Sequence, residues 1–307
     1  MKKTLLAIAV TGLFGATAQA TTVYDADGTY VQVGADIEVN FSKAAADGSE
    51  SVMSVDDADI SVQISQTVQE GLSVFGQVEL DADDNDTADL DTALVGLSSD
   101  EMGTIYFGKQ VTIKDDSGIF NDYKLGVSDI VPNATSSGDQ VIRYKFDNDS
   151  FYFGAAYAMN TDVLEGADGD LSSIDGNIGF VGVENLELVV YLGSNDITAD
   201  EAQTYAQFQG IYTVDNLTLS VIAATTSYDG ESGSGFGGQI AYAMDKATYS
   251  LGIQSTSNED VNGTDQVDYF AGVGYALSNN ATAYAQIGGD DTDDSELAYA
   301  VGIDFGF

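Results

Sequence analysis

From residue 21 to the end of the chain, apolar and polar side chains alternate one by one, and this pattern constrains the fold more than any other feature. In the segment 59–68, for example, Ile60, Val62 and Ile64 fall on one side and polar residues fall on the other. A period of two is typical of a β-strand, because successive strand side chains point to opposite faces. The single proline and the lack of a 3.6-residue apolar stripe leave little room for helices. An all-β fold is therefore predicted.

Turn-type residues divide the alternating runs in a regular way. Seven connections are short: 69–71, 99–103, 148–150, 184–185, 215–216, 245–247 and 278–280. Eight are longer and polar: 42–57, 82–90, 111–138, 160–172, 195–201, 230–235, 258–265 and 290–295. Short and long connections that alternate along the chain predict sixteen antiparallel strands with tight turns at one end and longer loops at the other.

This layout favours a transmembrane β-barrel. Lipid requires one apolar face, a water-filled lumen permits a polar face, and closure leaves no strand edge unpaired in hydrocarbon. A barrel of sixteen strands is wide enough to enclose an aqueous channel. A soluble β-sandwich or barrel is the alternative, since it would also alternate. Many positions on the apolar face are Ala, Gly or Tyr, whereas a sandwich core favours Leu, Ile, Val and Phe.

The first twenty residues are expected to be a signal peptide that is removed. Lys2 and Lys3 precede a short apolar stretch, and residues 18–20 form a small-x-small cleavage site. Residues 21–307 then form one barrel domain. No later apolar run approaches the roughly 18 residues of a membrane helix. Export without such an anchor leaves three options: a periplasmic protein, a secreted protein or a membrane β-barrel.

The charge and residue types exclude several classes of function. The chain has 9 Lys+Arg against 50 Asp+Glu, for a net charge of −41, so we expect no nucleic-acid partner. It contains no Cys for a disulfide or thiolate site, and no His for a general base. No G-x-S-x-G motif is present either. The chain is therefore not predicted to be an enzyme, and no cofactor is expected.

An aspartate-rich run, 81–92, raises the question of a calcium site. An EF-hand loop needs Gly at its sixth position and Glu at its twelfth, whereas this run has Asp86 and Thr92 there. We therefore predict no metal site. Weak, non-specific divalent cations at the acidic loops, bridging the barrel to lipopolysaccharide, remain an option.

The few cations are unevenly distributed. Seven Lys and Arg residues follow the signal peptide, and five of them lie between residues 109 and 145: Lys109, Lys114, Lys124, Arg143 and Lys145. The other two are Lys43 and Lys246, of which Lys246 falls in a predicted turn. Such a concentration in an acidic chain indicates a functional role. A solvated patch without a role in permeation is the alternative.

Short motifs along residues 21–307 resemble the general, non-specific porins of Gram-negative outer membranes. The start, VYDADGTYVQVGADIEVNF, is similar to the opening strand of that family. The segments 71–80, 92–110 and 141–146 look like its third to sixth strands. The final Phe307 matches the carboxy-terminal aromatic signal read by the barrel-assembly machinery. The resemblance implies a trimer of sixteen-stranded barrels in the outer membrane, in contact with lipid and lipopolysaccharide, that passes small hydrophilic solutes.

In that family the third external loop folds into the barrel, and its acidic cluster faces a basic cluster on the wall. The resemblance places Lys109, Arg143 and Lys145 on the wall. It places the loop at about 111–138, with the charged residues Lys114, Asp115, Asp116, Asp122, Lys124 and Asp129. The chain departs from the family at Ala35 and Asp59, where inward basic residues are common. The usual Pro-Glu-Phe-Gly-Gly stretch of the loop is also missing.

These departures predict a channel that prefers cations, because charged rings at the narrow zone set ion selectivity. The alternative is a substrate-specific channel, for instance for an oligosaccharide, with Tyr191 and Tyr284 as first candidates for an aromatic track. A barrel that serves as an adhesin or phage receptor through its loops is compatible with either channel.

Overall fold

The computed structural model describes residues 20–82, 88–127, 129–159, 171–198, 200–257 and 265–307. Strands dominate it: β1 (Thr21–Ala26), β2 (Thr29–Lys43), β3 (Val52–Gln69), β4 (Leu72–Asp81), β5 (Asp89–Ser99), β6 (Gly103–Val111), β7 (Ser137–Asp147), β8 (Phe151–Met159), β9 (Ser172–Val183), β10 (Leu186–Asp196), β11 (Ala202–Val214), β12 (Leu217–Tyr228), β13 (Glu231–Met244), β14 (Ala247–Ser257), β15 (Asp265–Ser278), β16 (Ala281–Asp290) and β17 (Ala298–Gly306). The expected signal peptide, 1–20, lies outside these residues except for its last position.

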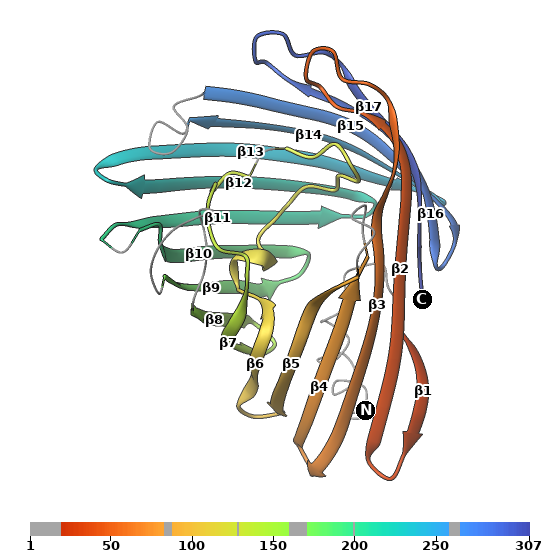
Figure 1. Ribbon diagram of the computed structural model, residues 1–307, viewed down its shortest axis with the longest axis vertical. Coiled ribbons are helices and arrows are strands. Elements are labelled where there is room, and N and C mark those ends of the chain that lie inside the picture. Colours follow the sequence, from red (N-terminus) through yellow and green to blue (C-terminus); the bar gives the residue numbers. More distant parts are fainter. Residues whose placement is uncertain (1–19, 83–87, 128, 160–170, 199, 258–264) are drawn as a thin grey trace.

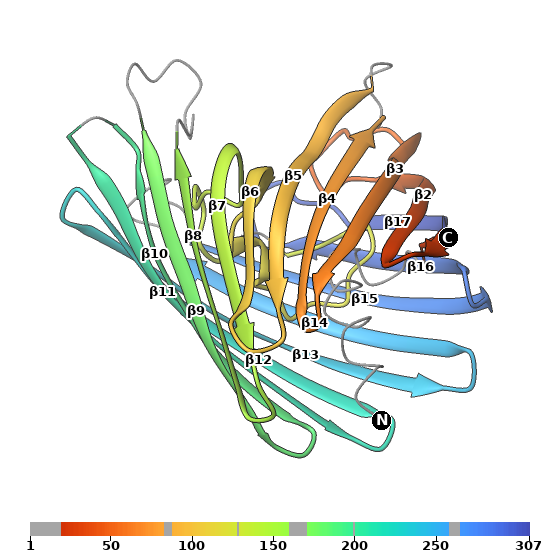
Figure 2. The ribbon, with the colours of Figure 1, turned by 90° about the horizontal axis from the view of Figure 1, so that it is seen from below.

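Sixteen of these strands, β2 to β17, form one closed antiparallel barrel. Each pairs with the next along the chain, and β17 pairs with β2 from Tyr299↔Lys43 to Gly306↔Asp36. Figures 1 and 2 show the continuous wall that results. The predicted sixteen-stranded barrel is confirmed, and the sandwich alternative is wrong. Among the described residues, no helix has the length and apolar character needed to cross a membrane.

The opening segment is a hairpin instead of one strand. Asp27 and Gly28 adopt positive φ values of 55° and 77°, which turn β1 back along β2. β1 pairs with the first residues of β2, Thr29 to Val33. The end of β17 pairs with β2 just beyond them, at Asp36. The backbone of Phe307 continues that pairing through two hydrogen bonds with Ala35. β2 is thus paired along its length with β1 at its start and with β17 and Phe307 further on.

The predicted faces of the strands are confirmed. On β3, Ile64 is 51% exposed on the outside, whereas the adjacent Gln63 is 1% exposed on the lumen side. On β17, Val301, Ile303 and Phe305 are exposed and Ala300 is buried. Exposed apolar residues cover the outer surface of the barrel, as lipid contact requires. Buried glutamines and other polar residues line much of the interior.

Most expected connections occur where turn residues stand, with one exception. Asn185, Asp215 and Asp245 take positive φ in the short turns, a conformation that Asn and Asp tolerate. The expected long loop at 230–235 is wrong, because only Asp229 and Gly230 separate β12 from β13. Residues 231–238, ESGSGFGG, are strand: Ser232 and Gly233 pair with Ser227 and Thr226 across the sheet.

Candidate functional site

The connection between β6 and β7, residues 112–136, runs inside the barrel (Figures 1 and 2). It begins with a short 3₁₀ turn, η1 (Lys114–Asp116), and has no strand of its own. Its residues contact strands on several sides of the lumen, as set out below. The predicted inward-folded third loop is therefore present, although its Pro-Glu-Phe-Gly-Gly stretch is missing.

Apolar side chains hold the loop against one part of the wall. Ile113, Ile119, Ile130 and Val131 are buried in a cluster with inward residues of β8 and β10 to β12: Ala156, Ala158, Val189, Tyr191, Tyr205, Ile222 and Ala224. Two glycines make room for it, since an added Cβ would meet Ile113 at Gly154 and Ile130 at Gly235, each at 2.5 Å. The sequence prediction missed this patch, because it expected the lumen side to be polar. Consecutive apolar residues at 188–190 were the available signal.

Polar contacts fix the loop along its path. At its start, Asp175 of β9 accepts hydrogen bonds from the Thr112 hydroxyl at 2.5 Å and the Lys114 backbone at 2.8 Å. In its middle, the Gln239 amide donates to the Ile119 carbonyl at 3.0 Å. At its tip, Gln286 of β16 accepts from the Leu125 backbone N–H at 2.7 Å and donates to the Leu125 carbonyl at 2.8 Å.

An aromatic stack adds to the contact at the loop tip. The Tyr123 ring lies on Tyr284 of β16 with centroids 4.5 Å apart and an interplanar angle of 4°. The Tyr284 hydroxyl in turn donates to Glu38 of β2. Tyr284 points inward as predicted, but it packs on the loop and does not stand alone as part of an aromatic track.

The basic wall predicted at Arg143 and Lys145 lies opposite the start of the loop. Arg143 is 3% exposed, and its Nη2 contacts both carboxylate oxygens of Asp116 at 2.7 Å. Lys145 reaches the same carboxylate at 2.9 Å. Tyr191 donates to the Asp116 carbonyl at 2.9 Å. One loop aspartate therefore pairs with both wall cations and reduces the positive charge that they present to the lumen.

The other predicted cations are held elsewhere. Lys114 pairs with Asp129 within the loop at 3.4 Å, and Lys124 pairs with Asp56 of β3. Lys109 pairs with Asp139 of β7 at 2.8 Å. A β-bulge in the β6–β7 pairing follows Gly108, and Lys109 pairs with Asp139 near the start of β7, whereas Arg143 and Lys145 pair with Asp116.

Acidic residues gather on the strands β17, β2, β3 and β4. Cross-strand pairing brings Asp36, Asp59 and Asp81 into one row, and brings Asp304, Glu38 and Asp57 into a second row. Asp59, a predicted residue of the constriction wall, lies in the first row, opposite Asp36 and Asp81. The sequence prediction missed the other members, because register joins residues as distant as Glu38 and Asp304.

The loop contributes further negative charge. Asp115 and Asp122 are exposed to the lumen, but the enclosing barrel reduces their hydration and so raises the pKa of each carboxyl above the ordinary 3.8. The negative charge of Asp116 adds to this increase in the pKa of Asp115. These two groups therefore become neutral at a higher pH than ordinary carboxylates.

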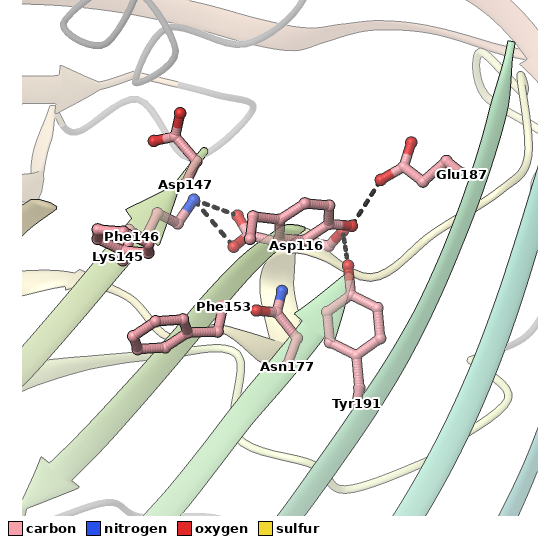
Figure 3. A pocket seen from close by; sticks show the side chains of 9 residues that line it. Asp116, Lys145, Phe146, Asp147, Phe153, Asn177, Glu187 and Tyr191 are labelled. Carbon is pink, nitrogen blue, oxygen red and sulfur yellow. Dashed lines mark hydrogen bonds and ion pairs between the residues drawn. The ribbon is translucent and has the colours of Figure 1, made fainter. Parts of the chain in front are cut away.

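A cavity of about 320 Å³ lies next to Asp116 at the start of the loop and is lined by residues of β7 to β10 (Figure 3). Its lining includes Asp116 of the loop, Lys145 of β7, Asn177 of β9, and Glu187 and Tyr191 of β10. The Tyr152 hydroxyl donates to Glu187 at 2.5 Å. The Asn177 Oδ1 atom is buried without a hydrogen-bond partner. The cavity combines aromatic rings with polar groups, as many small-molecule sites do.

Within the described parts of the chain, no three acidic residues converge closely enough to hold a metal ion. The acidic run at 81–92 falls partly on residues 83–87, outside the described residues. The expectation of weak, non-specific divalent cations at the loops stays a prediction.

A closed sixteen-stranded barrel with an apolar outer face, a polar lumen and an inward loop defines a porin of the outer membrane. The model of the Gram-negative porin family matches residues 4–295. The chain belongs to this family.

Known relatives agree with this assignment. Porin-like protein H of Photobacterium profundum is 27% identical over 331 residues that cover all of both chains. Among solved structures, the trimer form of OmpT from Vibrio cholerae has a TM-score of 0.76 at 19% identity, over 92% of this chain and 100% of that one. An anion-selective porin from Comamonas acidovorans has a TM-score of 0.80 at 12% identity, over 91% of this chain and 100% of that one.

Proposed function

We propose that this porin forms a water-filled channel that prefers cations and passes small hydrophilic solutes by diffusion. The observation that carries the proposal is the acidic wall, defined here as Asp36, Glu38, Asp57, Asp59, Asp81 and Asp304. Charged side chains at the narrow part of a pore set the sign of its ion selectivity. Asp59 and Ala35 also stand where many family members carry inward basic residues.

The distribution of the Lys and Arg side chains also supports a preference for cations. Arg143 and Lys145 both pair with Asp116, and Lys114 and Lys124 pair with Asp129 and Asp56. The acidic wall has six acidic side chains and no Lys or Arg at these positions. A unit charge about 7 Å from an ion in water changes its energy by about 0.6 kcal/mol, which is close to RT and changes local ion concentration roughly threefold. The structural likeness to an anion-selective porin does not oppose the proposal, because lumen side chains set the sign and the backbone does not.

The direct test is the reversal potential of the purified porin in a planar bilayer under a KCl gradient. We expect a potential of the sign that indicates K⁺ preference. The preference should weaken as the salt concentration rises from about 0.1 M to about 1 M, since the Debye length falls from about 10 Å to about 3 Å. A reversal potential that indicates Cl⁻ preference would refute the proposal.

We extend the proposal to the assembly. A homotrimer in contact with lipid and lipopolysaccharide, inserted by the barrel-assembly machinery through Phe307, is the expected state. The trimer form of a structurally similar outer-membrane protein supports it. Conductance that rises in threefold steps would identify a trimer. No catalytic activity and no cofactor are proposed.

A substrate-specific channel is the second candidate, and the cavity in Figure 3 favours it. Tyr152 and Tyr191 supply aromatic rings to its lining, and Glu187 supplies a carboxylate that can accept hydrogen bonds from hydroxyl groups. Saturable uptake of a sugar that blocks the ion current would support this function. Uptake that stays linear across many solutes would support the general channel.

A further inference from the structure

The third loop lies against glycines of the barrel wall at several contact points. Gly235 shares the lumen face of β13 with Gln239, and Gly274 shares the lumen face of β15 with Phe270, because alternate residues of a strand point the same way. The contacts are Ile113 with Gly154 of β8, Phe120 with Gly237 and Ile130 with Gly235 of β13, and Tyr123 with Gly274 of β15. Loop side chains thus occupy the places where other wall residues would carry a Cβ atom.

The wall has no room for even a methyl group at two of these points. A Cβ atom on Gly235 would lie 2.5 Å from Cγ1 and 3.1 Å from Cδ1 of Ile130. A Cβ atom on Gly274 would lie 2.8 Å from Cζ of Tyr123 and closer still to its hydroxyl oxygen. Non-bonded carbon atoms prefer a separation of about 3.5 to 4.0 Å, so each methyl group would displace the loop side chain by about 1 Å. Neither glycine has a positive φ, so close approach of the loop is what requires a glycine there.

The two loop side chains are held in place and cannot simply turn away. Ile130 is 5% exposed and is packed in the apolar cluster with residues of β10 to β12. The ring of Tyr123 is stacked on Tyr284, with centroids 4.5 Å apart. Close-packed groups transmit a displacement to their neighbours. Because the wall blocks movement in one direction, the loop would shift away from β13 and β15, toward the lumen.

We propose that Gly235 and Gly274 are size-determining residues of the channel. They let the loop lie about one methyl group closer to the wall, and so they keep the aperture between the loop and the opposite wall wide. The inference rests on the proposed water-filled channel. It does not depend on cation preference, because neither residue carries a charge.

The experiment compares Gly235→Ala, Gly274→Ala and the double variant with the original porin. Single-channel conductance in a planar bilayer should fall about 1.2-fold in each single variant and about 1.5-fold in the double variant, since each methyl group moves the loop by about 1 Å. Swelling of porin-containing liposomes in L-arabinose and in sucrose measures the size limit. The ratio of the sucrose rate to the arabinose rate should fall about twofold in the double variant, because a narrower aperture hinders the larger sugar more.

Two controls separate aperture from barrel stability. Gly76→Ala adds the same methyl group to the outer face of β4, where it would meet no listed atom closer than 3.4 Å, and it should leave conductance and swelling unchanged. Ile130→Ala removes the atoms that a methyl group on Gly235 would meet. In the Ile130→Ala background, Gly235→Ala should therefore cause no further fall in conductance. A purely structural defect would persist in that background.

The two positions are tested separately, so the inference stays open to refutation if one variant fails to insert. Unchanged conductance and an unchanged sucrose-to-arabinose ratio in the inserted variants would overturn it. A fall in Gly235→Ala that persists in the Ile130→Ala background would overturn it for Gly235. The reversal potential of the same channels tests the proposed function independently. Cation preference with an unchanged size limit refutes the role of the glycines, whereas a narrowed channel that prefers anions refutes the cation preference alone.

Discussion

The two sides of the lumen are built differently. On the side of β8 to β16, the loop packs through apolar residues such as Ile113 and Ile130 and through neutral amides such as Gln239 and Gln286. On the side of β17 to β4, the wall is acidic, and the loop meets it through the pair Lys124–Asp56. The comparison shows that the residues that position the constriction and those that charge it are largely separate sets.

Neutralising the acidic wall should produce the largest functional change. The triple variant Asp57→Asn/Asp59→Asn/Asp81→Asn removes three acidic groups from the lumen, and each negative charge that is lost lowers the local cation concentration by about threefold. We expect the K⁺ over Cl⁻ permeability ratio, obtained from the reversal potential, to fall about tenfold or more. The loop side should be unaffected, so the barrel should keep its single-channel open state.

A charge-matched triple variant in the short turns, Asp149→Asn/Glu184→Gln/Asp215→Asn, serves as the control. It should leave the permeability ratio within about twofold of the original value, because these residues lie at the end of the barrel. Similar losses in the two triple variants would show that the wall has no special role.

Removing Arg143 should change the channel next most strongly. Arg143→Ala takes one positive charge from the wall and leaves Asp116 with Lys145 as its remaining partner. We expect cation preference to increase by about threefold and the single-channel conductance to change with it. Lys246→Ala, in a short turn, removes the same charge and should alter neither quantity. An unchanged reversal potential in Arg143→Ala would mean that the cationic cluster has no role in permeation.

Releasing the tip of the loop should affect the stability of the current more than its selectivity. Gln286→Ala removes hydrogen bonds to the Leu125 backbone and one of 3.0 Å from the Lys124 backbone N–H, each worth about 1 kcal/mol. We expect more frequent transitions between conductance levels. Gln63→Ala is the matched control, because Gln63 is a buried lumen glutamine without a hydrogen-bond partner. Equal noise in both variants would exclude an anchoring role for Gln286.

Acidification should have the smallest effect that is still measurable near neutral pH. The pKa of Asp115 and of Asp122 lies above 3.8 because the barrel reduces their hydration. Since a raised pKa favours the neutral carboxyl, these two groups lose charge at a higher pH than carboxylates with an ordinary pKa, and cation preference should begin to decline before ordinary carboxylates titrate. Reversal potentials of the original porin, recorded from about pH 7 to about pH 4, should show this decline. In the double variant Asp115→Asn/Asp122→Asn, the part of the decline that occurs at higher pH should be absent.

The strands and their faces could be predicted from the sequence, because alternation of apolar and polar residues indicates both that a segment is a strand and which of its side chains share a face. Ile64 could be placed on the outer face and Gln63 on the lumen face from the neighbouring residues alone. The path of the loop could not be predicted in the same way. It depends on inward apolar residues such as Val189 and Ile222, and a lumen-facing valine looks the same in sequence as any other strand residue.

The site was predicted in part for a related reason. Arg143, Lys145 and Asp116 were expected on facing elements, and the structure brings them together. Asp59 and Ala35 signalled a less basic wall. The remaining acidic residues were not singled out, since Asp304 and Glu38 become neighbours only when the first and last strands of the barrel pair. Lys109 is on the wall strand β6 and pairs with Asp139, in a part of the β6–β7 pairing where a bulge follows Gly108.

The loop's attachment through neutral amides and aliphatic contacts makes the filter modular. Asp56 of β3 pairs with Lys124 of the loop, whereas Asp57, Asp59 and Asp81 lie outside the apolar cluster that holds the loop. Replacement of these three by neutral or basic residues therefore does not require compensating changes in the scaffold. Natural selection or a protein engineer can therefore retune which solutes enter the cell by editing a few side chains, while the mechanical frame that sets the aperture is inherited intact.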